Sequence, residues 1–194
     1  MGTTLKTRLL ELLLEKSFKY DDEPVFKLAS GRMSNYYIDC RTTTHNPEGK
    51  HLIGSLIFEM IKDLEIQAVG GLTMGADPIA CAVSHEAYLS GKRISSFSVR
   101  KEPKQHGTKR QIEGDVHTGD RVVIVEDVIT TGSSTIKAIE AAQAAGLDVV
   151  KVIALVDREE GGRQEIARYV PDVAAICTRT ELIEKYKSTK CPES

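Results

Sequence analysis

Two adjacent carboxylates and a hydroxyl-rich turn follow one another in the middle of the chain. Residues 122–134 read Val-Val-Ile-Val-Glu-Asp-Val-Ile-Thr-Thr-Gly-Ser-Ser. We interpret them as an apolar strand that ends in Glu126 and Asp127, followed by a turn that opens a helix. The first turn of a helix has unpaired backbone N–H groups and the positive end of the helix dipole, which suit a phosphate group. The turn contains no lysine, so it is not a Walker A loop.

The paired acids limit which ligand this turn could take. Carboxylates beside an anion site are unfavourable unless they face hydroxyls, a cation or a developing positive charge. A phosphorylated sugar supplies all three, with its phosphate on the turn and its hydroxyls on Glu126 and Asp127. The alternative is an ordinary capped helix, in which Ser133 and Ser134 serve only as N-cap residues. That alternative explains the serines but not the paired acids.

A cationic cluster stands in a polar stretch over residues 100–119, which we interpret as a loop. Arg100, Lys101, Lys104 and His106 fall within seven residues, with Glu102 as the counter-charge inside the cluster. A polar loop of this length in a compact domain is typical of an active-site lid, and its charges suit a diphosphate. Taken alone, such a cluster is more often a solvated surface loop. Beside residues 122–134, the lid interpretation is favoured.

Alternating helices and strands must position these residues. Apolar periodicity predicts helices over residues 4–16, 48–64, 78–89, 133–145, near Gln164 and over 181–187, and strands over 68–72, 94–99, 122–125, 149–156 and 173–177. Strands that are apolar on both faces and alternate with helices predict an α/β fold with a mostly parallel central sheet flanked by helices. Such sheets bind ligands at the carboxyl edge of their strands. The first 40 residues precede the alternation, and we expect them to form a small N-terminal cap over that edge.

Two further turns are expected at the same edge. Residues 72–78 lie between a short strand and a helix, so they form a second candidate anion site, or simply a tight turn with Asp77 as N-cap before a proline. Arg158 follows the strand over 149–156, where its guanidinium could hold a carboxylate or an imide by paired hydrogen bonds. The alternative for Arg158 is a surface arginine that pairs with Glu159 or Glu160.

Composition excludes several broad classes of protein. The 194 residues carry a formal net charge of −2, with 41 % hydrophobic and 28 % charged residues, so we expect one domain over 1–194 and no nucleic-acid partner. No apolar run approaches the roughly 20 residues that span a bilayer, and no secretory signal is visible, so we expect no membrane partner and a cytoplasmic location. The four cysteines show no metal-ligand spacing and are expected to be free thiols, with Cys81 and Cys177 as small core residues.

Residues 122–134 resemble the phosphoribosyl diphosphate (PRPP) signature of the type I phosphoribosyltransferase family. Residues 26–37 (FKLASGRMSNYY), 99–107 (VRKEPKQHG) and 156–162 (VDREEGG) resemble its orotate phosphoribosyltransferase members, and the likeness runs from about Leu5 to Arg168. The resemblance implies the fold of that family, with a hood formed by the N-terminal cap and a flexible lid loop. It also implies transfer of the 5-phosphoribosyl group from PRPP to orotate in pyrimidine (UMP) biosynthesis, giving orotidine 5′-monophosphate and diphosphate.

The resemblance further implies a role for individual residues. The catalytic residues would be Asp127, Glu126, Lys104 and His106. Orotate would be bound by Thr130, Arg158, Tyr37 and Ile38. PRPP would be bound by Arg100, Lys101, Lys104, His106, Glu126, Asp127, Val128, Ile129, Thr130, Thr131, Gly132, Ser133, Ser134, Thr73 and Met74. The family implies Mg²⁺ as cofactor, held mainly through the substrate without a dedicated protein cage, and a homodimer in which the lid loop reaches the partner's active site.

One position departs from the family pattern. Many members have a lysine before the Ser-Gly of the first motif, and this chain has Ala29, as some other members do. Two alternative functions stay open at this point. One is a phosphoribosyltransferase for another base, such as a purine, and the other is a non-catalytic PRPP-binding regulator.

Overall fold

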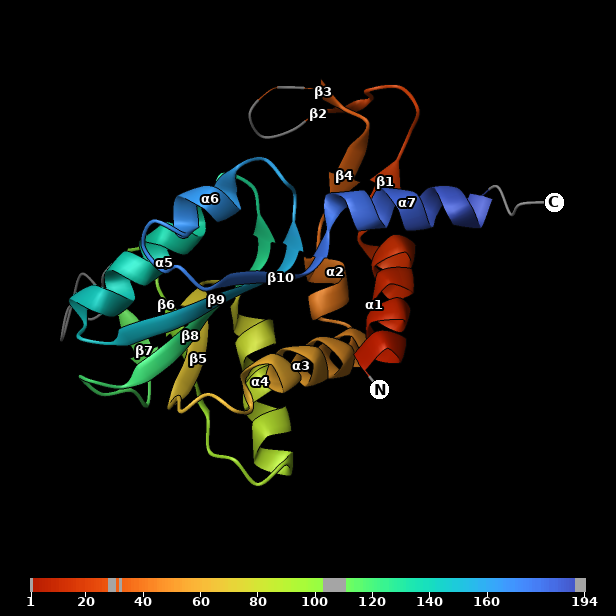
Figure 1. The fold of residues 1–194 in the computed structure, drawn as a ribbon. Coiled ribbons are helices and arrows are strands. Elements are labelled where there is room, and N and C mark those ends of the chain that lie inside the picture. The colour runs from red at the N-terminus through yellow and green to blue at the C-terminus, as the bar shows by residue number, and fades with distance from the viewer. Residues whose placement is uncertain (1, 28–30, 32, 103–110, 191–194) are drawn as a thin grey trace.

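The computed structural model describes residues 2–27, 31, 33–102 and 111–190 and has one six-stranded sheet at its centre (Figure 1). The strands, in the order in which they lie side by side, are β10 (Val173–Thr178), β9 (Asp148–Asp157), β8 (Arg121–Ile129), β5 (Ala68–Leu72), β6 (Ser95–Val99) and β7 (Ile112–Gly114). Every neighbouring pair is parallel except β6 and β7, which are antiparallel. The prediction of a mostly parallel α/β sheet is therefore confirmed.

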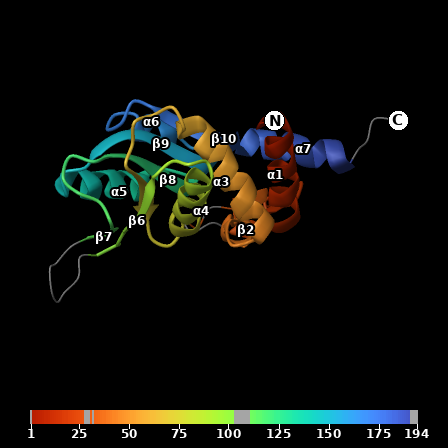
Figure 2. The same ribbon diagram turned by 90° about the horizontal axis from the view of Figure 1, so that it is seen from below.

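Helices cover both faces of this sheet (Figures 1 and 2). One face packs against α3 (Pro47–Ile61) and α4 (Asp77–Leu89), with α1 (Gly2–Lys16) packed beside α3, and the other against α5 (Ser133–Ala144) and α6 (Gly162–Ile166). Val123 and Val125 of β8 belong to the first core, whereas Val122 and Ile124 belong to the second. This alternation explains why the central strands are apolar at almost every position. Among the described residues, no helix has both the length and the apolar character needed to cross a membrane.

The first 40 residues add two short antiparallel ribbons to α1. One joins β1 (Phe18–Tyr20) to β4 (Tyr36–Ile38), and the other joins β2 (Phe26–Lys27) to β3 (Met33–Ser34). The short helix α2 (Arg41–Thr44) follows, and α7 (Arg179–Lys190) lies beside β1 and β4 (Figure 1). The first 40 residues thus contain paired strands as well as a helix. The boundary of the cap at about residue 40 stays a prediction.

Two local predictions were wrong. β8 does not end at the paired acids but continues to Ile129, because its backbone still pairs with β9 at Val128 and Ile129. The stretch over residues 100–119 is not loop throughout, because β7 forms within it and pairs Ile112 with Val99 of β6. In both places hydrogen bonds to a neighbouring strand override the polar local sequence.

The described cysteines are free thiols with different surroundings. Cys40 and Cys177 are buried, as expected for Cys177, but Cys81 is exposed. Its prediction as a core residue was wrong because α4 turns Ile79, Ala80 and Val83 toward the core and leaves Cys81 on the outer face.

Candidate functional site

The two acids of β8 are held by groups from three different elements. Glu126 is only 5 % exposed, and its carboxylate accepts hydrogen bonds from Thr135 Oγ1 of α5 (3.1 Å) and from the backbone N–H of Asp127 (3.3 Å). The half-buried Asp127 carboxylate accepts from Val128 N at 2.9 Å. It also lies against Gly75 in the turn after β5, where a β-carbon would be only 2.6 Å from Asp127 Oδ1. The fold therefore brings residues 75, 126, 127 and 135 together.

This arrangement changes the acidity of Glu126. Burial, and after it the charge and hydrogen bonding of Asp127, raise the pKa of Glu126 to about 8. The hydrogen bond from Thr135 acts in the opposite direction but does not compensate. Two carboxyl groups that disfavour each other's charge are stabilised by an incoming hydroxyl donor or positive charge. The pair is therefore suited to a ligand that brings hydroxyls and develops positive charge.

The raised pKa of Glu126 predicts a pH-dependent stability. A carboxyl group whose pKa rises on folding stabilises the protein fully below its ordinary value of 4.5, and this contribution is lost as pH rises through about 8. Gln at position 126 mimics the protonated acid. We therefore expect the melting temperature of Glu126→Gln to rise relative to that of the native chain between pH 5 and pH 9.

A matched control for this prediction is available on α5. Glu140 lies on the exposed side of that helix, so Glu140→Gln is expected to leave the pH dependence of the melting temperature as it is in the native chain. A melting-temperature difference between Glu126→Gln and the native chain that stays constant from pH 5 to pH 9 would contradict the assignment.

The hydroxyl-rich turn keeps its side chains available for a ligand. The N-cap of α5 is Gly132, whose φ of 84° lies in the left-handed region that glycine adopts without strain. Ser133 and Ser134 lie inside the helix and are exposed, so the alternative in which they serve only as N-cap residues is wrong. Thr131 is also exposed. Exposed hydroxyls and the helix N-terminus suit the phosphate predicted for this turn, and we call residues 130–134 the cradle.

The beginning of α6 holds this turn in place. Gly162 N donates a hydrogen bond to the carbonyl of Thr130 at 3.0 Å. A β-carbon on Gly162 would lie 2.4 Å from that oxygen and 2.7 Å from Gly132 N, so only glycine allows this approach. The cradle is therefore positioned by a second turn, which follows β9.

The turn between β5 and α4 lies beside the carboxylates. The backbone N–H of Thr73 donates to the carbonyl of Val99, the Thr73–Met74 peptide bond is cis, and Met74 is largely exposed. Asp77 is not the N-cap, as the alternative proposed, because the helix begins at Asp77 itself. Its carboxylate accepts from Ser98 Oγ of β6 at 2.7 Å. Since Gly75 meets Asp127, the structure places the second candidate anion turn next to the two acids of β8.

The cationic stretch after β6 is described in part. Arg100 N donates to the carbonyl of Gln111, and its side chain lies 3.5 Å from Glu113. Arg100 and Lys101 are both exposed at the carboxyl end of β6. Lys104 and His106 lie outside the described residues, and so does Ala29. Their roles stay predictions.

Arg158 leaves the carboxyl end of β9 close to the cradle. Its backbone N–H donates to the carbonyl of Ile129, the last residue of β8. Its side chain pairs with Glu160 at 3.0 Å, as the alternative predicted, yet is only 14 % exposed and so is not a surface arginine. The guanidinium also lies within 3.3–3.4 Å of the hydroxyl of Tyr36.

The residues predicted to flank the base have unlike surroundings. Tyr37 is exposed and its ring stacks on Phe26 with centroids 6.4 Å apart, whereas Ile38 is half-buried in β4. Tyr36 precedes Tyr37 in β4. It is buried, and its hydroxyl lies 3.3 Å from Arg158 Nη2. Only one residue of the Tyr36–Tyr37 pair is therefore a core residue, and the exposed one is available to a ligand.

Sequence reasoning missed two residues that shape this site. Thr135 binds Glu126 from the first turn of α5, and no motif distinguishes it from other helical threonines. Gly75 stands in a turn that was already a candidate anion site. A glycine in the turn between a strand and the following helix is a signal that another group approaches the backbone closely.

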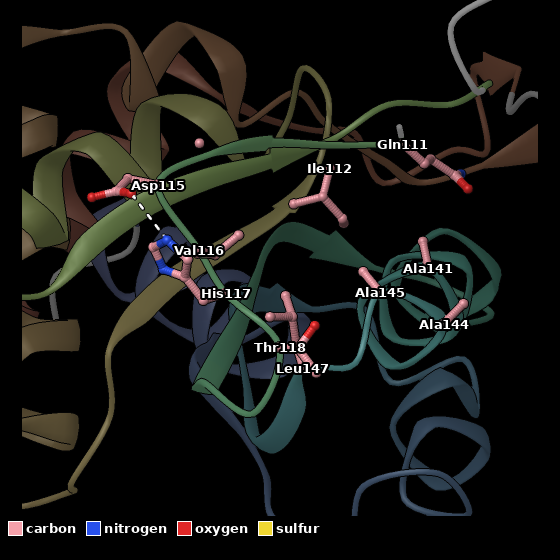
Figure 3. A pocket seen from close by; sticks show the side chains of 11 residues that line it. Gln111, Ile112, Asp115, Val116, His117, Thr118, Ala141, Ala144, Ala145 and Leu147 are labelled. Atoms are coloured by element: carbon pink, nitrogen blue, oxygen red, sulfur yellow. Dashed lines mark ion pairs between the residues drawn. The ribbon is translucent and has the colours of Figure 1, made fainter. Parts of the chain in front are cut away.

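A separate cavity of about 720 Å³ lies between β7, the segment after it and the C-terminal part of α5 (Figure 3). Alanines of α5 point toward it, and His117 lies 3.9 Å from Asp115 on the opposite side. Its lining includes Thr118 and Leu147, which precede β8 and β9 and so stand at the amino edge of the sheet. None of the lining residues is a predicted site residue, so the carboxyl edge is the candidate site.

A doubly covered, mostly parallel sheet, with paired acids in the last part of a central strand and a hydroxyl-rich turn after it, is typical of the phosphoribosyltransferase class of α/β protein. A family model described as "Phosphoribosyl transferase domain" matches residues 42–182. Two curated relatives carry the name orotate phosphoribosyltransferase. The one from Aquifex aeolicus is 50 % identical over 163 residues, covering 84 % of this chain and 89 % of its own length. The one from Sorangium cellulosum is 46 % identical over 185 residues, covering 94 % and 95 %.

A solved structure gives the same result. The crystal structure of Mycobacterium tuberculosis orotate phosphoribosyltransferase in complex with PRPP has a TM-score of 0.76 and 36 % identity to this chain, and the match covers 92 % of this chain and 98 % of that one. The chain belongs to the orotate phosphoribosyltransferase family. The family resemblance of the sequence motifs is thereby confirmed.

Proposed function

We propose that this protein transfers the 5-phosphoribosyl group of PRPP to N1 of orotate, giving orotidine 5′-monophosphate and diphosphate for pyrimidine biosynthesis. The observation that carries the proposal is the acid pair of β8, which lies beside the cradle at the start of α5. The relatives from Aquifex aeolicus and Sorangium cellulosum, both named orotate phosphoribosyltransferase, support it. PRPP has the matching chemistry, because it presents a 5′-phosphate, ribose hydroxyls and a diphosphate leaving group. A related enzyme was crystallised with PRPP.

The acids act on the ribose. As the bond between C1 and the diphosphate breaks, positive charge develops on the sugar, and a fixed carboxylate beside it stabilises that charge. Asp127, half-buried and held by Val128 N, is the proposed stabilising group. Glu126 holds a ribose hydroxyl. Its pKa of about 8 means that near neutral pH the carboxyl group can be protonated, so it can donate a hydrogen bond to the hydroxyl as well as accept one from it.

The turns around the acids position the remaining parts of PRPP. The cradle over residues 130–134 binds the 5′-phosphate and so fixes the sugar relative to the base. Thr73 and Met74, in the turn whose Gly75 meets Asp127, bind the diphosphate together with Arg100 and Lys101. Lys104 and His106 cover the departing diphosphate, and one of them donates a proton to it. Arg158, Tyr37, Ile38 and Thr130 bind orotate.

The site is compatible with Mg²⁺ as the cofactor. Mg²⁺ takes oxygen ligands and usually keeps substrate phosphates and water among them, and the two carboxyl groups disfavour each other's charge unless a positive group is near. When bound, the ion neutralises charge on the diphosphate. Within the described residues, no group of three or more histidine, cysteine or acidic side chains is arranged to hold a metal. We propose that the ligands are mainly substrate oxygens, with Glu126 and Asp127 beside them.

A panel of bases tests the proposed function directly. The purified protein is incubated with PRPP and Mg²⁺ plus orotate, uracil, adenine or hypoxanthine, and diphosphate release is measured. We expect turnover with orotate and none with the other bases. Turnover with a purine would favour the purine alternative, and PRPP binding without turnover of any base would favour the non-catalytic regulator.

Replacing Arg158 tests the assignment of the base site. Arg158→Ala removes a charge-assisted hydrogen-bond partner, which typically costs roughly 1.5–3 kcal/mol, or about one to two decades in affinity. We expect the KM for orotate to rise by that factor while the KM for PRPP changes little, as measured by initial rates with each substrate varied. A larger effect on PRPP would show that Arg158 does not serve the base.

The proposed enzyme is a homodimer with shared active sites. Three large apolar side chains lie on and next to α4 with much of their surface exposed, namely Met74 (66 %), Tyr88 (74 %) and Leu89 (66 %). Met74 precedes the first residue of α4, whereas Tyr88 and Leu89 end that 13-residue helix, so exposed apolar side chains stand at both of its ends and we propose that the partner lies along it. Met74 belongs to the diphosphate turn, so an interface there would bring a partner chain close to the active site. Cytoplasmic location stays a prediction of the sequence.

A further inference from the structure

A buried cluster links the N-terminal ribbons to the base site. The Tyr36 hydroxyl donates to Glu160 Oε1 at 2.9 Å and lies 3.4 Å and 3.3 Å from Arg158 Nε and Nη2. Glu160 Oε1 is 3.0 Å from Arg158 Nη2, and both of these side chains are largely buried. The ring of Tyr36 stacks on Phe18, which fixes its direction. One carboxylate oxygen and one hydroxyl thus hold the same side of the guanidinium.

The backbone between Arg158 and Glu160 is held in an unusual conformation. Glu159 has φ of 56°, and it is the one non-glycine residue with positive φ among those that the structure describes. Its N–H donates to Asp157 Oδ1 at 2.8 Å, and its carboxylate accepts from Thr180 N and Oγ1 at the start of α7. A left-handed non-glycine residue that other contacts hold in place often marks a functional site. Here it turns Glu160 back toward Arg158.

These contacts occupy one side of the guanidinium and leave the other. Among the described residues, Arg158 Nη1 makes no hydrogen bond, whereas Nε and Nη2 are engaged. Building on the proposed function, we propose that Tyr36 and Glu160 are positioning residues for orotate, which hold Arg158 by Nε and Nη2 and leave Nη1 for the base. A guanidinium fixed before binding loses less side-chain freedom when the base arrives, so affinity for orotate depends on residues that do not touch it.

Conservative variants separate positioning from simple packing. Tyr36→Phe keeps the ring on Phe18 but loses the hydroxyl, and we expect the KM for orotate to rise about three- to tenfold with kcat and the KM for PRPP within about twofold of native values. Glu160→Ala is expected to raise the KM for orotate about tenfold. Glu160→Gln still accepts a hydrogen bond from Tyr36, so its KM for orotate is expected to stay much closer to the native value. Tyr20→Phe is the matched control, because Tyr20 lies opposite Tyr36 in the ribbon and contacts Tyr186 instead.

A double-mutant cycle tests whether Tyr36 acts through Arg158. If it does, Tyr36→Phe has no further effect on the KM for orotate in the Arg158→Ala background. An equal fold-change in both backgrounds, or a rise in the KM for PRPP as large as that for orotate, would overturn the proposal. So would a KM for orotate that stays native in Tyr36→Phe and Glu160→Ala while the native chain turns over orotate. Absence of orotate turnover by the native chain would instead refute the proposed function.

Discussion

Asp127→Asn is expected to lower kcat for orotate about 100- to 1,000-fold, the loss typical when one preorganised electrostatic group is removed from a transition state. The substitution keeps the shape of the side chain, and its Oδ1 still accepts from Val128 N, so the turn at Gly75 is not disturbed. What disappears is the negative charge beside the ribose. Glu126→Gln is expected to lower kcat less than Asp127→Asn does, because Gln mimics the protonated form that the raised pKa of Glu126 favours, and to have more effect on the KM for PRPP.

The measurement is steady-state kcat at saturating orotate and PRPP, with folding checked by melting temperature. Asp115→Asn serves as control, because the Asp115 side chain is largely exposed beside the cavity of Figure 3 and away from the carboxyl edge. This control is expected to keep native kcat. A folded Asp127→Asn variant with near-native kcat would rule out the electrostatic role of Asp127.

The second large effect is recovery of activity from two inactive variants. Lys104→Ala damages the lid loop, and Asp127→Ala damages the acid pair of β8. If each active site combines the loop of one subunit with the acids of the other, a mixed dimer has one doubly damaged site and one intact site. Random exchange in an equal mixture makes about half of the dimers mixed, so about one quarter of native activity is expected.

Subunit exchange must be shown independently, for example with two differently tagged chains that are purified in sequence. Asp127→Ala mixed with Asp127→Asn is the matched control, because two lesions at the same position leave no site intact. Recovery is therefore expected only in the mixture of loop and acid-pair variants. A mixture that exchanges subunits and stays inactive would exclude shared sites and place the loop and the acids of each site in one chain.

Local patterns in the sequence determined the class of fold and the main parts of the site. Apolar strands that alternate with amphipathic helices leave a covered parallel sheet as the compact arrangement, and the observed sheet agrees. The acids and the hydroxyl-rich turn were recognisable because they are contiguous in sequence. Strand and helix termini were less well defined, since hydrogen bonds between strands extend β8 through Glu126 and Asp127.

The tertiary structure alone decided which distant residues support these motifs. Gly75 lies against Asp127, Thr135 binds Glu126, and Gly162 holds the cradle, yet none of these contacts leaves a periodic signal in the sequence. Tyr36 and Glu160 stand 124 positions apart and meet only because the N-terminal ribbon folds back over the end of β9. Contacts of this kind depend on how whole elements pack, and packing is set by the shape of the complete core rather than by any short segment.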